Sequence, residues 1–207
     1  MTAGILITRR ELKEFYRKTI HFSSLIIPLS YKYVLGYNKR LAILVLLPLA
    51  VIAVVIEIVR LENRTVKRIF YKTFGIMLRK HEMVDFTGAS YLLTSSVFTI
   101  VLFPREIAFA ALSFLSVGDT MAAIIGIRYG HRKIIGTNKS LEGALACFSS
   151  CFAYALAFGL HPDIALAGAL AATMSELSSF PLDDNLRIPI VSGIIMSIVS
   201  IFVPITY

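Results

Sequence analysis

Long apolar runs separated by short polar segments dominate this chain. A transmembrane helix needs about 20 predominantly apolar residues to cross a hydrocarbon core of roughly 30 Å. Runs near that length give seven candidate spans, at residues 20–36, 41–59, 86–103, 106–126, 141–160, 163–180 and 188–206. Tyr31 and Lys32 interrupt the first and the sixth carries Glu176, so these two are the least suited to crossing fully. The pattern predicts an all-α, polytopic membrane helix bundle that forms a single domain over residues 1–207.

The segment 60–84 is too charged to cross a membrane but has the pattern of an amphipathic helix. Its apolar residues recur at helical spacing, and its basic residues lie on the opposite face. The apolar face holds Val66, Ile69, Phe70, Phe74, Met77 and Leu78, and the basic face holds Arg64, Lys67, Arg68, Lys72 and Arg79. We expect an interfacial helix with its basic face near anionic headgroups.

Composition excludes an ordinary soluble domain. Hydrophobic residues make up 57% of the chain and charged residues 16%, whereas about a quarter of a soluble domain is charged. The formal net charge is +8, but the basic residues lie between apolar runs and form no continuous basic domain, so we expect no nucleic-acid partner. No small-residue cleavage site follows an apolar core near the N-terminus, so we expect no cleaved signal peptide.

The basic residues predict the orientation of the chain in the membrane. The segment before the first span and the second, fourth and sixth loops lie on one side of the membrane, and they hold seventeen of the 21 lysines and arginines. The other four, counting Lys32, lie in the first and third loops on the opposite side. Because cytoplasmic segments carry the excess of basic residues, we expect a cytoplasmic N-terminus and an external C-terminus. Four groups of polar residues that membrane spanning does not require then fall at cytoplasmic ends.

The first two groups place charged side chains at or inside apolar runs. Arg17 and Lys18 precede the first span and suit a membrane anchor equally well, whereas His21 within that span needs a partner. Asp119 lies inside the fourth span, where a carboxylate must face a cavity, a cation or a partner. Small residues around it suit either close helix packing or the approach of a nucleotide to the backbone. They are Gly118, Ala122, Ala123, Gly126 and Gly130.

The third group is the basic cytoplasmic loop 127–139 and the helix start that follows it. It contains Arg132, Lys133, Lys139, Ser140, Glu142 and Gly143. Free N–H groups at a helix start and fixed cations both stabilise anions, so this segment suits a phosphate. The spacing differs from the P-loop pattern Gly-x-x-x-x-Gly-Lys-Ser/Thr. Glu142 has an alternative role as a helix cap.

The fourth group is Asp183, Asp184 and Asn185, with Glu176 in the span before them. Carboxylate and amide oxygens are ligands that Mg²⁺ prefers. The alternative is a solvated turn in which Asn185 caps the next helix. Together the four groups supply what phosphoryl transfer uses, namely carboxylates for a metal, donors for phosphates and a group that takes a proton from a hydroxyl. Their placement implies a cytosolic polyphosphate and an acceptor dissolved in the membrane.

In this order and over nearly the whole chain, the four groups resemble the motifs of the dolichol kinase, phytol kinase and CTP-dependent diacylglycerol kinase family. The resemblance rests on Arg17-Lys18-x-x-His21, Gly118-Asp119-x-x-Ala122-Ala123-x-x-Gly126-x-x-x-Gly130, Lys139-Ser140-x-Glu142-Gly143 and Asp183-Asp184-Asn185-x-x-x-Pro189. It implies transfer of the γ-phosphate of CTP, with Mg²⁺ or another divalent cation, to a polyprenol, dolichol, phytol, geranylgeraniol or diacylglycerol. The short chain fits an enzyme of a prokaryotic cell membrane.

The resemblance also implies site residues. Arg17, Lys18, Asp119 and Gly126 fall on positions that the family treats as essential. We expect metal ligands among Asp119, Asp183, Asp184 and Asn185, phosphate contacts from Lys139 and Arg17, and a proton acceptor in His21 or Glu176. The remaining candidate nucleotide-binding residues are Gly118, Gly126, Gly130, Arg132, Lys133, Ser140, Glu142 and Gly143.

Two alternatives stay open. The first is a CTP-dependent cytidylyltransferase that makes a CDP-lipid, from a distantly similar family with an aspartate motif and a Lys-x-x-Glu-Gly element. Its C-terminal signature Gly-Gly-x-x-Asp-Arg-x-Asp is absent from this sequence. The second is a transporter of small anions or lipids, which would also place Asp119 and Glu176 within the membrane. The chain has no detectable repeat halves to support it.

Overall fold

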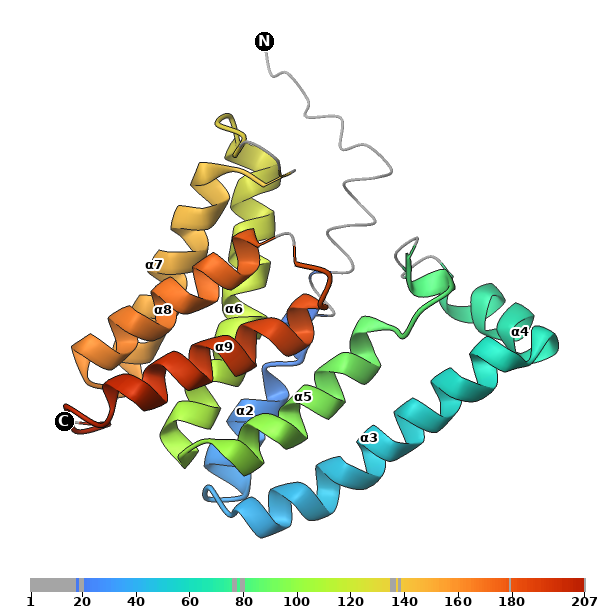
Figure 1. Cartoon of the computed structure of the whole chain (residues 1–207), viewed down its shortest axis with the longest axis horizontal. Coiled ribbons are helices and arrows are strands. Elements are labelled where there is room, and N and C mark those ends of the chain that lie inside the picture. The colour runs from blue at the N-terminus through green and yellow to red at the C-terminus, as the bar shows by residue number, and fades with distance from the viewer. Residues whose placement is uncertain are drawn as a thin grey trace.

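The computed structural model describes residues 18, 21–75, 78, 81–134, 137, 139–178 and 180–206, and over this part it is all-α (Figure 1). The chain order begins with α2 (Ile26–Leu29) and the π-helical turn η1 (Ser30–Val34), then α3 (Lys39–Glu62), α4 (Arg64–Phe74) and the 3₁₀ turn η2 (His81–Met83). It continues with α5 (Gly88–Leu102), α6 (Arg105–Tyr129), α7 (Leu141–Ala157), α8 (Pro162–Leu177) and α9 (Asp184–Val199).

Helix α6 forms the centre of the bundle. It packs against α7, α8, α9, α5 and α2, and in Figure 1 it runs behind α8 and α9. Its buried face includes Ile107, Phe114 and Leu115, all fully buried. A helix surrounded in this way must be apolar on nearly every side, and Asp119 is the one charged residue on the buried face of α6, where Ser113, Ser116 and Thr120 are the other polar residues.

Glycines bring α6 and α7 into close contact. A Cβ atom built on Gly143 would lie 2.8 Å from the backbone oxygen of Ala122, and one on Gly126 would lie 3.2 Å from Ser140 Oγ. A Cβ on Gly118 would lie 2.7 Å from Cys151 Sγ. The small residues therefore serve helix packing, and their contact with a nucleotide stays a prediction.

Helix α3 lies at the edge of the bundle and exposes an apolar surface. Leu44 is 70% exposed and Ile52 is 54% exposed, although the helix has a mean hydropathy of 3.0 over its most apolar stretch. In the described part of the chain, α3 and α6 are long and apolar enough to cross a membrane, and α5 and α7 are shorter apolar helices. This exposed face indicates a membrane protein, while the number of seven spans stays a prediction.

The helix bounds differ from the apolar runs at several places. The described part of span 20–36 contains α2 and η1 rather than one regular helix, and α6 extends to Tyr129, three residues beyond its run. Helix α4 forms the predicted amphipathic helix over Arg64–Phe74 only, since residues 60–62 end α3 and Leu78 lies outside a helix. Met77 and Arg79 lie outside the described residues. Helix α9 begins at Asp184, before the run that starts at 188, because Asp183 caps it. The alternative in which Asn185 is the cap is therefore wrong.

Candidate functional site

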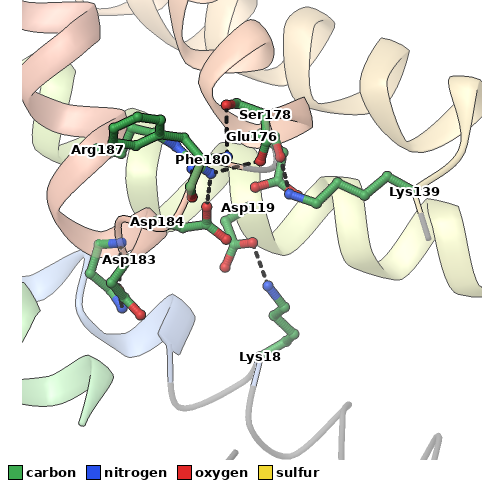
Figure 2. A network of polar contacts seen from close by, with 10 residues as sticks. Lys18, Asp119, Lys139, Glu176, Ser178, Phe180, Asp183, Asp184 and Arg187 are labelled. Atoms are coloured by element: carbon green, nitrogen blue, oxygen red, sulfur yellow. Dashed lines mark hydrogen bonds and ion pairs between the residues drawn. The ribbon is translucent and has the colours of Figure 1, made fainter. Parts of the chain in front are cut away.

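Three carboxylates from three helices meet near the middle of the molecule. They are Asp119 of α6, Glu176 of α8 and Asp184 of α9, and one oxygen of each lies within 4.8 Å of the others. Asp119 is 5% exposed and Glu176 is 7% exposed. Figure 2 shows the three side chains pointing toward one another. We call these residues the carboxylate cluster.

Each member of the carboxylate cluster has its own cationic partner, and the three cations come from three separate parts of the chain. Lys18 donates a hydrogen bond to Asp119 Oδ1, and Arg187 pairs with Asp184. The ammonium group of Lys139 lies 3.0 Å from Glu176 Oε1 and also donates to the backbone oxygen of Glu176. Since isolated charges are costly to bury, these pairs offset part of the cost of placing three carboxylates close together.

His21 joins the same cluster. Its Nε2 lies 3.2 Å from Asp119 Oδ2, and Ser24 on the next turn shares a hydrogen bond of 2.7 Å with Ser116 of α6. These contacts fix the start of the first predicted span against α6. The partner that the position of His21 requires is therefore Asp119. Arg17, which the sequence also assigns to this group, lies outside the described residues.

The carboxylate cluster has the donor set of a divalent-cation site. All its ligand atoms are hard oxygens, as Mg²⁺ and Ca²⁺ prefer. Glu176 Oε2 is buried and has no hydrogen-bond partner among the described residues, as expected for an oxygen directed at a ligand. The residues thus fit a metal ion held by Asp119, Glu176 and Asp184. Glu176 was expected from the sequence as a proton acceptor rather than as a ligand.

Asp183 and Asn185 lie beside this cluster in a different arrangement. Asp183 Oδ1 accepts from the Asn185 backbone N at 2.9 Å and from Asn185 Nδ2 at 2.6 Å. Figure 2 shows Asp183 to one side of the three carboxylates. In the described contacts, both residues serve the start of α9, and their role as metal ligands stays a prediction.

The predicted phosphate segment adopts a tight loop before α7. Ser140 caps α7, with its Oγ accepting from Gly143 N at 3.2 Å, and the backbones of Lys133 and Ser140 form a β-bridge. The Glu142 carboxylate accepts from the Arg132 backbone N at 3.2 Å and from the Glu142 backbone N–H in the first turn of α7. Ser140 is the capping residue of α7, and the Glu142 carboxylate assists at the same helix end. A Cβ atom on Gly130, at the end of α6, would lie 2.6 Å from Ser140 Oγ.

A cavity of about 420 Å³ adjoins the carboxylate cluster. Lys18, His21, Asp119 and Asp184 line one end of it. Residues from α3, α4 and α5 line the rest, including Ala53, Ile56, Phe70, Phe74, Ala89 and Leu92. The carboxylate cluster therefore faces a largely apolar space.

Sequence reasoning missed a second buried polar group on the far side of this cavity. Arg60 is fully buried and donates to Glu57, to the Glu82 backbone oxygen at 2.9 Å and to the Asp85 backbone oxygen at 2.6 Å. Glu57 in turn accepts from Thr87. These contacts tie the end of α3 to the start of α5. The signal was present, because Glu57 is an ionisable residue within the apolar run 41–59.

Comparison with known proteins finds relatives that match most of the chain. A CTP-dependent diacylglycerol kinase of Saccharomyces cerevisiae is 28% identical over 95% of this chain and 76% of its own length. The corresponding protein of Eremothecium gossypii is 29% identical over 96% of this chain and 70% of its own. An uncharacterized protein of Methanocaldococcus jannaschii is 32% identical over 90% of this chain and 94% of its own. No family model and no solved structure matches the chain.

Proposed function

We propose that the chain, which is distantly related to CTP-dependent diacylglycerol kinases over most of its length, is a CTP-dependent lipid kinase of the dolichol kinase and phytol kinase family. The acceptor is the hydroxyl of an isoprenoid alcohol or of diacylglycerol. The site faces the cytoplasm, where CTP is available, and the acceptor reaches it from the bilayer.

The observation that best supports this function is the pairing of three carboxylates, two of them buried and one partly buried, with three cations. Without a ligand the charges of Lys18, Lys139 and Arg187 balance those of the carboxylate cluster. Asp119, Glu176 and Asp184 would hold a divalent cation, which would offset part of the negative charge of the carboxylates and of the phosphates. Lys18 and Lys139 are then able to turn to the oxygens of the nucleotide, as transfer of a phosphoryl group requires.

The acceptor oxygen forms the new bond to the γ-phosphorus of CTP. The bond between that phosphorus and the β–γ bridging oxygen breaks, and CDP leaves. His21 takes the hydroxyl proton. It is better supported than Glu176 in this role because it lines the cavity beside Asp119, whereas Glu176 is held by Lys139. A proton acceptor must lie within reach of the hydroxyl that it serves.

A neutral alcohol suits this site better than the anionic lipid phosphate that a cytidylyltransferase uses. The polar end of the cavity carries Asp119 and Asp184, and Glu57 and Glu82 lie along its wall. Lys18 is the one lysine or arginine among the described residues that line the cavity, and it is already paired with Asp119, so an anionic acceptor would find no uncommitted basic side chain there. The same argument favours attack on the γ-phosphorus over attack on the α-phosphorus.

Two labelled forms of CTP test the proposal with the purified chain in detergent. We expect label on the γ-phosphorus to pass to an added lipid alcohol, and label on the α-phosphorus to appear in CDP with no labelled lipid. Recovery of α-label in a CDP-lipid would establish the cytidylyltransferase instead. A transporter would leave both forms of CTP unchanged. A panel of farnesol, geranylgeraniol, phytol, undecaprenol, dolichol and diacylglycerol identifies the acceptor.

A further inference from the structure

The cavity beside the carboxylate cluster changes character along its length. At its inner end, His21 and Asp119 contact each other. At its other end, Ile56 of α3 and Phe74 of α4 line the cavity, yet they are 47% and 45% exposed. Side chains that both line a cavity and remain half exposed mark its mouth. The cavity therefore opens where α3 meets α4.

The mouth adjoins the apolar outer surface of α3. Ile52 is 54% exposed and Val55 is 51% exposed on the same part of this helix. An exposed apolar surface of this kind faces lipid in a membrane protein. A molecule dissolved in the bilayer thus has an apolar route to the mouth, whereas a charged nucleotide does not.

The inner end also offers an unused hydrogen-bond acceptor. Asn185 is 7% exposed and lines the cavity, and its Oδ1 has no hydrogen-bond partner among the described residues. Its Nδ2 donates to Asp183 Oδ1 at 2.6 Å, which fixes the orientation of the amide. A buried acceptor without a donor is unfavourable unless a ligand supplies the donor. A hydroxyl supplies it, and a hydrocarbon tail does not.

The predicted phosphate segment lies on the other side of the carboxylate cluster. Lys139 reaches Glu176 there, and Ser140 packs against α6. Lys139, Ser140 and Glu176 are not among the described residues that line the cavity. The predicted phosphate segment and the cavity therefore adjoin different sides of the carboxylate cluster. In-line transfer requires this arrangement, because the donor and the acceptor approach the phosphorus from opposite directions.

We infer that this cavity is the acceptor site: a neutral lipid alcohol enters between α3 and α4, its chain lies against Ala53, Ile56 and Leu92, and Asn185 positions its hydroxyl beside His21. This inference rests on the proposed function for the identity of the occupant. Asn185 acts as a positioning residue: its Oδ1 accepts from the hydroxyl when the alcohol binds, and the O–H bond then turns from Asn185 to His21, which takes the proton as the oxygen attacks.

Photolabelling tests the site without relying on turnover. The full chain in detergent is exposed to a diazirine derivative of geranylgeraniol, and in parallel to one of a diacylglycerol, each with the diazirine within the hydrocarbon chain. We expect labelled peptides from α3 and α5. Unlabelled geranylgeraniol should compete, and the hydrocarbon that lacks only the hydroxyl should compete at least tenfold less well. Labels elsewhere, or equal competition by the hydrocarbon, would overturn the inference.

A matched pair of substitutions on α3 tests the same site by kinetics. Ala53→Phe fills the cavity, whereas Val55→Phe adds the same ring to an exposed position outside it. We expect Ala53→Phe to raise the KM for the alcohol at least tenfold with the KM for CTP unchanged, and Val55→Phe to change neither. Equal effects of the two variants would overturn the site.

Asn185→Ala should likewise raise the KM for the alcohol, while the Mg²⁺ concentration for half-maximal activity stays constant. A changed Mg²⁺ requirement with an unchanged alcohol KM would make Asn185 a metal ligand and overturn its positioning role. If the wild type transfers no γ-phosphate to any alcohol but the photolabel still marks α3 and α5, the proposed kinase function fails while the acceptor site stands.

Discussion

At the scale of single residues, Asp119 links more of the site than any other described side chain. It contacts Lys18 and His21 and shares the carboxylate cluster with Glu176 and Asp184. Because Lys18 is itself 5% exposed, the two charges depend on each other. Removing one partner of a buried pair leaves the other charge uncompensated and costs about 3–5 kcal/mol.

We predict that Asp119→Asn lowers kcat by at least about 100-fold, the order expected when one preorganised electrostatic contact is lost. The amide keeps the shape of the carboxylate but neither its charge nor its strength as a metal ligand. The thermal midpoint of unfolding should also fall, because Lys18 loses its counter-charge. Initial rates at saturating CTP and Mg²⁺, together with a melting curve, measure both effects.

Asp163→Asn is the matched control, because the Asp163 side chain is 65% exposed near the start of α8. It should change neither quantity. Wild-type turnover of Asp119→Asn at saturating Mg²⁺ would contradict the assignment of Asp119 as a metal ligand.

The site could be predicted from sequence only as a set of residue types. Ionisable residues within apolar runs identified His21, Asp119 and Glu176, because such residues are costly without partners. The pairing could not be predicted, since Lys18 and Asp119 are 101 positions apart. Asp183 and Asp184 are neighbours in sequence, but they have different roles because α9 begins between them. Asp183 caps the helix, and Asp184, its first residue, joins the carboxylate cluster.

At the scale of helices, the contact between α6 and α7 holds the predicted phosphate segment next to Asp119. A Cβ atom on Gly143 would meet a backbone oxygen at 2.8 Å, and a backbone atom cannot turn aside as a side chain can. An added methyl group there must separate the two helices. Overpacking of this kind costs about 1–3 kcal/mol.

We predict that Gly143→Ala lowers the thermal midpoint and weakens CTP binding, because Ser140 moves with the start of α7. Cys147 and Cys151, both buried at the same helix contact, provide the measurement, since a thiol-reactive dye labels them only when the helices separate. Ser149→Ala, at an exposed position on α7, should leave the dye curve unchanged. An unchanged midpoint in Gly143→Ala would mean that α6 and α7 are less closely packed.

Apolar runs predicted the helices but not their irregularities. The pattern of 41–59 matches α3 because a long uninterrupted apolar run favours a helix. It does not predict the π-helical turn η1, which depends on hydrogen bonds rather than on hydropathy. It also does not predict that Arg60 folds back to hold the backbone of Glu82 and Asp85, because that contact requires the tertiary fold.

At the scale of the whole molecule, the contacts between loops agree with the orientation expected from the basic residues. Lys39 in the first loop donates to the Phe103 backbone oxygen at 2.6 Å, and His161 N donates to the Ile205 oxygen at 2.9 Å. Phe109 contacts both Tyr37 and Phe158, so these segments share one end of the bundle. They are the loops with few basic residues.

We therefore predict that Lys133 lies on the cytoplasmic side and Thr206 on the external side. Lys133→Cys and Thr206→Cys in sealed vesicles of known orientation, treated with an impermeant maleimide, should react from opposite sides. The unsubstituted chain is the control, because Cys147 and Cys151 are 1% and 0% exposed and should react only after denaturation. Labelling of both substituted positions from the same side would refute the odd number of spans that we predict between Lys133 and Thr206. If Lys133→Cys were labelled from the external side, CTP would have to approach the carboxylate cluster from that face, because Lys133 is tied by its bridge to Ser140 at the start of α7.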